Sequence, residues 1–249
     1  MSDLERKTKE KYFIDGDYIE ERKALHEVII NKILKETERK DLPEAFLLGG
    51  GAASGKSTVR DEIILAEHDE KEDFTNIDSD EIKKYIPEFS KILLIDMDKA
   101  AVIVHDESSD IAEKILNQCI ERKQHLIYDG TMKNLEKYEA LIKELRQNGY
   151  KINGVMVNLP LDLAIERAEI RASIENRVVP LSIIKESHME VPDTFYKIKE
   201  QLDNYAVYDN SGEFPELVAF KEKNDKEEMV IDKEKYAEFF LKANINIFE

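Results

Sequence analysis

Residues 44–57 read EAFLLGGGAASGKS, an apolar run that passes directly into a glycine-rich stretch. The last eight residues, from Gly50 to Ser57, match the pattern G-x-x-x-x-G-K-[ST] of a phosphate-binding P-loop. The pattern is meaningful between a strand and a helix, and both neighbours fit, because AFLLGG indicates a buried strand and KSTVRDEIILAEH a helix. Glycines let backbone N–H groups turn toward phosphates, and the following helix points its positive end at them. The stretch therefore predicts a nucleoside-triphosphate site.

Each residue of this loop has an expected role. Lys56 would reach the β- and γ-phosphates, and the Ser57 hydroxyl would hold Mg²⁺. The pattern suits ATP and GTP equally. The residues expected to bind the nucleotide are Gly50, Gly51, Ala52, Ala53, Ser54, Gly55, Lys56, Ser57 and Thr58.

Strand and helix signals alternate after the loop. Strands are predicted at FTNID, QHLIYD and YKINGVMVNLP, with helical stretches between them. This alternation predicts an α/β protein with a mostly parallel sheet covered on both faces, the three-layer P-loop NTPase fold. A charge run at residues 221–228, read as a solvated turn between ELVAF and MVI, belongs to an expected C-terminal αβ extension.

The chain before the loop is expected to be a helical N-terminal extension. We divide the chain into this extension, residues 1–42, and a kinase domain, residues 43–249. The extension has an apolar stripe that must be buried somewhere, since an isolated helix is marginal in water. We expect it to pack on the kinase core, and the alternative is docking of a partner. The stripe consists of Leu25, Ile29, Ile30, Ile33 and Leu34.

Composition narrows the class of function. The 249 residues include 37 Lys and Arg against 54 Asp and Glu, a net charge of −17 that disfavours nucleic acid as a partner. No run is long enough to span a membrane, and the N-terminus lacks the apolar core of a signal peptide. The single Cys119 is read as a buried small hydrophobe rather than a nucleophile, and the five histidines show no metal-ligand spacing. We therefore expect a cytoplasmic protein.

Acidic residues follow two of the predicted strands, where ligands of parallel sheets bind. Asp78-Ser79-Asp80 follows FTNI and suits either deprotonation of an acceptor hydroxyl or magnesium coordination. Helix capping is the alternative, and both can hold if one residue caps and another is catalytic. Asp129, before Gly130 and Thr131, is either a Walker-B-like acid or a turn residue. His105 opens the segment HDESSD, which we read as a capped helix start.

Three arginines, Arg167, Arg171 and Arg177, follow the fourth predicted strand. Arg167 and Arg171 are four residues apart and share one helix face. A mobile arginine-rich segment here could close over the transferring phosphoryl group. The alternative is a solvated face paired with neighbouring glutamates.

Together these motifs resemble the zeta toxin family, kinases of toxin–antitoxin systems that phosphorylate UDP-N-acetylglucosamine. The resemblance covers roughly residues 44–210 and rests on the P-loop, Asp78-Ser79-Asp80, the segment VHDESSDIAEKI, Asp129-Gly130-Thr131, the arginines and NRVVP. It implies Asp80 as the general base, Glu113 as an acid that contacts the substrate, and Arg167 and Arg177 as phosphate ligands. Asp129 and Thr131 would lie at the acceptor, although the toxin pattern has Glu where this chain has the shorter Asp129.

The sequence therefore predicts a kinase acting on a nucleotide sugar, UDP-N-acetylglucosamine first, with an antitoxin as a possible protein partner. Another small-molecule phosphotransferase on the same fold, such as an antibiotic or metabolite kinase, is the nearest alternative. A nucleotide-binding module without turnover is a third, against which the acids Asp80, Glu113 and Asp129 argue, because binding alone needs no base. Polynucleotide kinase is a weaker alternative, given the negative charge.

Overall fold

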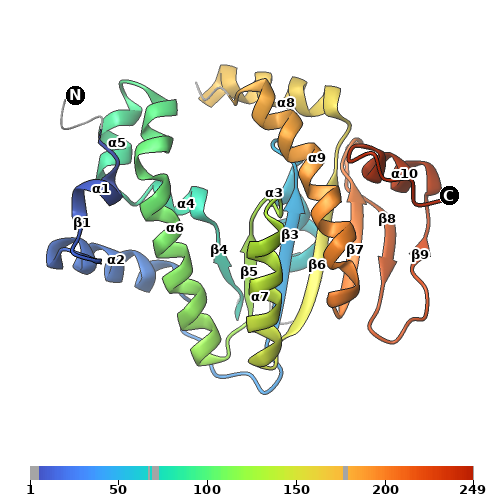
Figure 1. The fold of residues 1–249 in the computed structure, drawn as a ribbon, viewed down its shortest axis with the longest axis horizontal. Helices are drawn as coiled ribbons and strands as arrows, with labels where there is room; N and C mark the ends of the chain where they lie inside the picture. Colours follow the sequence, from blue (N-terminus) through green and yellow to red (C-terminus); the bar gives the residue numbers. More distant parts are fainter. Residues whose placement is uncertain (1–5, 67, 69–72, 176–178, 249) are drawn as a thin grey trace.

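The predicted P-loop follows the third strand of a seven-stranded sheet, the middle one of its five parallel strands, in the computed structural model, which describes residues 6–66, 68, 73–175 and 179–248 (Figure 1). The strand order is β4-β5-β3-β6-β7-β8-β9. The first five strands are parallel, β8 pairs antiparallel with β7, and β9 pairs antiparallel with β8. The bounds are β3 Glu44–Gly50, β4 Thr75–Ile77, β5 Leu126–Asp129, β6 Lys151–Asn158, β7 Asn204–Asp209, β8 Glu216–Lys221 and β9 Met229–Val230. The predicted α/β fold with a mostly parallel sheet and a C-terminal αβ extension is confirmed.

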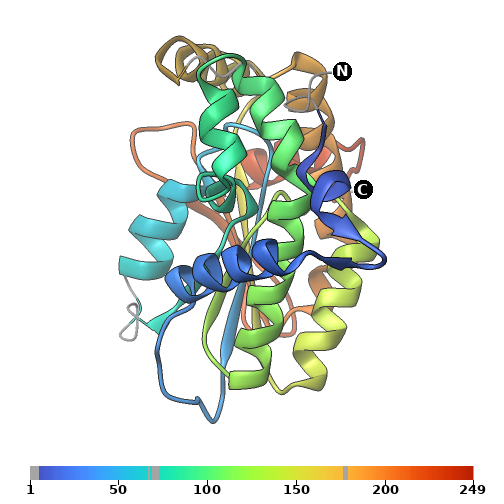
Figure 2. The ribbon, with the colours of Figure 1, turned by 90° about the vertical axis from the view of Figure 1, so that its left-hand side faces the viewer.

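Helices cover both faces of the sheet, so the molecule has three layers (Figure 2). Side chains of a strand alternate between the faces, and β3 shows it. Ala45 and Leu47 belong to the core beneath α6, α7 and α9, whereas Leu48 packs with Val59 and Ile64 on the other face. The helical bounds are α3 Lys56–Val59, the π-helical η2 Arg60–Leu65, α4 Ser79–Lys83, α5 Pro87–Leu93, α6 Met97–Arg122, α7 Leu135–Gln147, α8 Leu161–Glu175, α9 Leu181–Ile198, the 3₁₀ turn η4 Lys199–Gln201 and α10 Lys233–Leu241.

The N-terminal segment contains more than the expected helix. It comprises α1 Thr8–Tyr12, a hairpin of β1 Phe13–Ile14 and β2 Asp17–Tyr18, and α2 Glu20–Ile33. The purely helical expectation was wrong at the hairpin, where Asp15 and Gly16 both adopt positive φ. An Asp-Gly pair is a strong signal for a two-residue hairpin turn, so the sequence carried this information. The apolar stripe packs as predicted, with Ile29 and Ile30 buried in the main core. The division at residue 42 stays our proposal.

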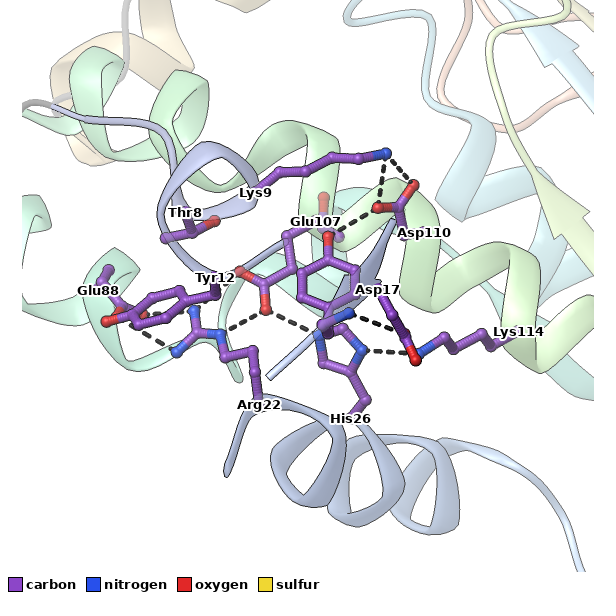
Figure 3. A network of polar contacts seen from close by, with 12 residues as sticks. Thr8, Lys9, Tyr12, Asp17, Arg22, His26, Glu88, Glu107, Asp110 and Lys114 are labelled. Carbon is purple, nitrogen blue, oxygen red and sulfur yellow. Dashed lines mark hydrogen bonds and ion pairs between the residues drawn. The ribbon is translucent and has the colours of Figure 1, made fainter. Parts of the chain in front are cut away.

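A buried polar network joins this segment to α6 (Figure 3). The Glu107 side chain is fully buried and accepts hydrogen bonds from Arg22, at 2.5 Å, and from Nε2 of His26, at 2.8 Å. Burial alone would raise the pKa of Glu107, but these two donors lower it to about 2. Arg22 also pairs with Glu88 at 2.7 Å. One guanidinium of α2 is therefore shared between carboxylates of α5 and α6.

The structure corrects one helix boundary. We expected a helix start at His105, but α6 begins at Met97, capped by the Asp96 side chain, and His105 lies inside it. The hydroxyls of Ser108 and Ser109 bond back to the His105 carbonyl, so they cap nothing.

Three further observations concern the fold. Cys119 is fully buried, as expected of a small core hydrophobe. Helix α9 and strand β7 were not among the predicted elements. Within the described ranges, no helix combines the length and the apolar character needed to cross a bilayer.

Candidate active site

The P-loop turns sharply between β3 and α3. Gly55 has φ +84° and Ala53 φ +61°, so the loop passes twice through the left-handed region. Lys56 starts α3 and donates its Nζ to the Gly50 carbonyl at 3.1 Å, which folds the ammonium back over the loop. Burial lowers the pKa of Lys56, against the opposing attraction of Asp129, Asp78 and Asp80. The partly buried ammonium therefore lies among acids.

Two of these acids end the strands on one side of β3. Asp78 follows β4 and Asp129 ends β5, which pairs directly with β3. Burial, reinforced by the charge of Asp129, raises the pKa of Asp78 to about 6. Burial also raises the pKa of Asp129, although Lys56 and Arg60 partly offset it. The guanidinium of Arg60 contacts Asp129 at 2.9 Å.

The two acids of Asp78-Ser79-Asp80 differ in their contacts, and only one of them caps a helix. The Asp78 carboxylate accepts from the N–H groups of Asp80 and Glu81, so it caps α4. The Asp80 side chain is 56% exposed and its Oδ1 lies 2.6 Å from Nζ of the buried Lys83. Asp80 is thus the acid that an acceptor could reach, and its role as base stays a prediction.

The arginine helix α8 lies against the P-loop. Arg167 donates to the Asn210 carbonyl at 2.8 Å, and the Asn210 amide donates to the Ser54 carbonyl at 2.9 Å. The charge of Arg171 contributes to lowering the pKa of Lys56, which places it near the same site. Arg177 lies outside the described residues. Arg167 is held in place by the chain that follows β7.

The two remaining predicted substrate contacts lie apart. The Thr131 carbonyl accepts from the Gly50 N–H at 3.3 Å, so this residue touches the P-loop. Glu113 is exposed on α6 and lines a pocket of about 310 Å³ with Lys9, Phe13 and Tyr18 of the N-terminal segment. The structure therefore gives Glu113 neighbours in the extension, and its substrate contact stays a prediction.

Three functional candidates were missed from the sequence. Arg60 lies four residues after Lys56, one turn along the same helical stretch, and this spacing could have suggested it. Asn210 directly follows β7, so the strand-end rule would have found it had β7 been recognised. The pairing of Lys83 with Asp80 has the ordinary helical spacing of three, which indicates only a surface ion pair. Its burial could not be read from the sequence.

A P-loop between a central parallel strand and a helix, with acids on the adjacent strand ends and arginines opposite, defines a P-loop kinase-like fold. The zeta toxin family model matches residues 30–223. The chain belongs to the zeta toxin family.

One curated relative and several solved structures are similar to this chain. The relative is the "Calmodulin calcium-dependent NAD kinase" of Arabidopsis thaliana, 27% identical over 77% of this chain and 45% of its own length. The chain thus spans less than half of that protein. The AvrRxo1-ORF1:-ORF2 complex aligns with a TM-score of 0.74, 19% identity and coverage of 95% of this chain and 82% of that one. A structure of AvrRxo1-ORF1:AvrRxo1-ORF2 with ATP aligns at 0.70, with 18% identity over 94% and 76%. The PezAT toxin–antitoxin system of Streptococcus pneumoniae aligns at 0.60, with 17% identity over 78% of each chain. At these identities the structures support the fold.

Proposed function

We propose that this chain is a kinase that binds ATP, or GTP, with Mg²⁺ and transfers the γ-phosphate to a hydroxyl of a small acceptor. The observation that carries the proposal is the convergence of Lys56, three carboxylates and Arg167 at one edge of the sheet. A structure similar to this one contains ATP, which supports a nucleotide at this edge.

The residues present fit a magnesium ion. Mg²⁺ prefers oxygen ligands, and the site offers the exposed Ser57 hydroxyl in the first turn of α3, near buried carboxylates. Ser57 would hold the ion. When bound, Mg²⁺ neutralises charge on the β- and γ-phosphates.

The chain's own residues account for the remaining chemistry. Asp80 takes the proton of the acceptor hydroxyl, whose oxygen then forms a bond to the γ-phosphorus. The bond between this phosphorus and its bridging oxygen to the β-phosphate breaks, and the nucleoside diphosphate leaves. Lys56 and Arg167 stabilise the charge on the transferring phosphoryl group. The family resemblance implies that Arg177 acts in the same way.

We place the acceptor among nucleoside diphosphate derivatives, with NAD and UDP-N-acetylglucosamine as the two candidates. Both offer hydroxyls beside a diphosphate, and arginines beyond those that the donor needs could bind the diphosphate. NAD comes first, because the curated relative is named an NAD kinase and matches 77% of this chain. The short Asp129 in place of Glu weighs against the acceptor of the toxin pattern.

An antitoxin-like protein is a proposed partner, supported by the similarity to a toxin–antitoxin system. We propose the cytoplasm as the site of action, since the donor and both acceptors are cytoplasmic metabolites. A metabolite or antibiotic kinase and a nucleotide-binding module without turnover remain as alternatives that the following assay separates.

The test is incubation with ATP, Mg²⁺ and a panel containing NAD, UDP-N-acetylglucosamine, free N-acetylglucosamine and an aminoglycoside, with products read by mass. A gain of one phosphate on NAD that is lost in Asp80→Asn supports the proposal. If UDP-N-acetylglucosamine is the better substrate, the acceptor is the one expected from the sequence rather than NAD. A better substrate without a diphosphate contradicts the proposed acceptor class, and ATP binding with no transfer to any candidate favours the binding module.

A further inference from the structure

Two side chains of helix α9 form hydrogen bonds with the tip of the P-loop. The sequence pattern did not connect this helix with the nucleotide. The Ala52 N–H donates to Oγ of Ser187 at 2.9 Å, and the Ala52 carbonyl lies 3.0 Å from Nε2 of His188. Ser187 and His188 are only 3% and 4% exposed. Two neighbouring side chains thus bind both polar groups of one loop residue.

The direction of both hydrogen bonds is determined. A carbonyl can only accept, so Nε2 of His188 carries the proton that it shares with Ala52. The Ser187 hydroxyl donates to the Ile184 carbonyl at 2.9 Å, which turns its lone pairs toward the Ala52 N–H. Burial lowers the pKa of His188 to about 4, so the ring is neutral at physiological pH. The His188 contact with Ala52 therefore needs no charge on the ring.

These supporting side chains lie close against the loop backbone at two glycines. A Cβ added at Gly51 would lie 2.3 Å from Cδ2 of His188. One at Gly55 would lie 2.1 Å from Nδ2 of Asn210, the amide that binds the Ser54 carbonyl. Glycine at these two positions therefore permits a close approach by the supporting side chains, in addition to the approach of phosphates that the motif implies.

The same contacts tie the loop to the arginine helix. Ala52 and Ala53 pack in one apolar cluster with Ala164 and Ala168 of α8 and Ile184 of α9. Arg167 lies between Ala164 and Ala168 in the sequence and donates a hydrogen bond to the Asn210 carbonyl. The P-loop, α8 with Arg167, and α9 pack against one another, so contacts within the protein set the distance between the P-loop and Arg167.

We propose that Ser187 and His188 are positioning residues of the nucleotide site, which hold the P-loop in its phosphate-binding shape and in register with Arg167. This inference rests on the proposed function, because it needs a nucleotide at the loop. Neither residue needs to touch the nucleotide. Losing one hydrogen bond in this role weakens ATP binding by about 3- to 10-fold. The affinity for the acceptor stays unchanged.

The test measures binding of ATP with Mg²⁺ to the full chain by calorimetry. His188→Leu removes the donor and keeps the approximate bulk, His188→Gln restores an N–H donor at similar reach, and Ser187→Ala removes only the hydroxyl. Met189→Ala, at an exposed neighbour on α9, is the matched control. We expect a 3- to 10-fold rise in the ATP dissociation constant for His188→Leu and Ser187→Ala, recovery to within about 2-fold in His188→Gln, and no change in the control.

The outcomes separate the two proposals. If wild-type protein binds ATP and both His188→Leu and Ser187→Ala bind it equally well, the positioning role is refuted while the kinase proposal stands. If wild-type protein binds neither ATP nor GTP, the proposed function falls, and this inference with it. Should His188→Leu fail to fold, as judged by circular dichroism, Ser187→Ala decides alone, because it removes one oxygen from a helix that keeps its packing.

Discussion

The buried ammonium of Lys83 lies 2.6 Å from Oδ1 of Asp80, one turn away on α4. The Lys83 side chain is 8% exposed and that of Asp80 56%. The lysine therefore anchors the carboxylate from the protein side and leaves the rest of it accessible. A base must reach the proton that it takes, and the exposed part of the Asp80 side chain meets this condition.

Asp80→Asn should lower kcat by about 10²- to 10⁴-fold with little change in the affinity for ATP, because the shape stays and the proton acceptor is lost. The measurement is steady-state transfer to the best acceptor of the panel, together with ATP binding. Asp78→Asn is the matched comparison, since asparagine caps helices as well as aspartate does. A severe defect in Asp78→Asn with a mild one in Asp80→Asn would show that the two roles are exchanged.

Lys56→Ala should reduce transfer by about 10²- to 10³-fold, the usual cost of removing one donor that stabilises charge on a transferring group. The fold should survive, because Lys56 lies at the start of α3 and its ammonium donates to the Gly50 carbonyl within the same loop. Circular dichroism and single-turnover transfer from labelled ATP check both points. Unchanged turnover in Lys56→Ala would contradict a role of the P-loop in phosphoryl transfer.

Arg22→Met should destabilise the protein by about 3–5 kcal/mol, since it leaves the fully buried Glu107 without its main charged partner. Lys23→Met is the matched control on the next residue, where the ion pairs with Asp17 and Glu20 are exposed and should add little to stability. Urea unfolding measures both. Equal effects of the two substitutions would show that burial of the Glu107 network adds nothing to stability.

The stability of the wild-type protein should fall between pH 6.5 and pH 4 more steeply than that of His188→Gln. The pKa of His188 is lowered from its ordinary 6.5 to about 4, so in this window the unfolded chain binds a proton that the folded protein refuses. The contribution is fully present above pH 6.5, is lost as the pH falls toward 4, and amounts to at most about 3 kcal/mol. The nearby ammonium groups of Lys242 and Lys56 act in the same direction. Urea unfolding at pH 7 and pH 4.5 measures the difference, and parallel pH profiles for the two proteins would contradict it.

The parts of the site that the sequence predicted are those made by neighbours along the chain. The P-loop with Lys56 and the acids Asp78 and Asp80 lie within single strand–turn–helix units, where short-range patterns carry the information. The supports of the P-loop were missed because they come from far away. Ser187 lies 135 residues from Ala52, and Asn210 lies 156 residues from Ser54. The side chains of Ser187, His188 and Asn210 follow no periodic sequence pattern from which such contacts could be predicted.

The surroundings of Glu113 could not be predicted from the sequence. A motif match assigns it to the acceptor, but the direction of a side chain on a 26-residue helix depends on what packs against each face. In this protein the N-terminal segment covers the face near Glu113, and the helical expectation for that segment gave no sign of the hairpin there. The fold class was predictable because the strand–helix alternation is repeated along the chain, whereas each side-chain contact occurs once.

Arg22 and Glu107 are 85 residues apart in the chain, and Lys7 and Asp106 are 99 apart. During synthesis at roughly 5–20 residues per second, the N-terminal segment leaves the ribosome on the order of ten seconds before its partners on α6 exist. Throughout that interval the N-terminal segment lacks its partners on α6. Docking of the N-terminal segment on α6 must therefore follow the emergence of that helix.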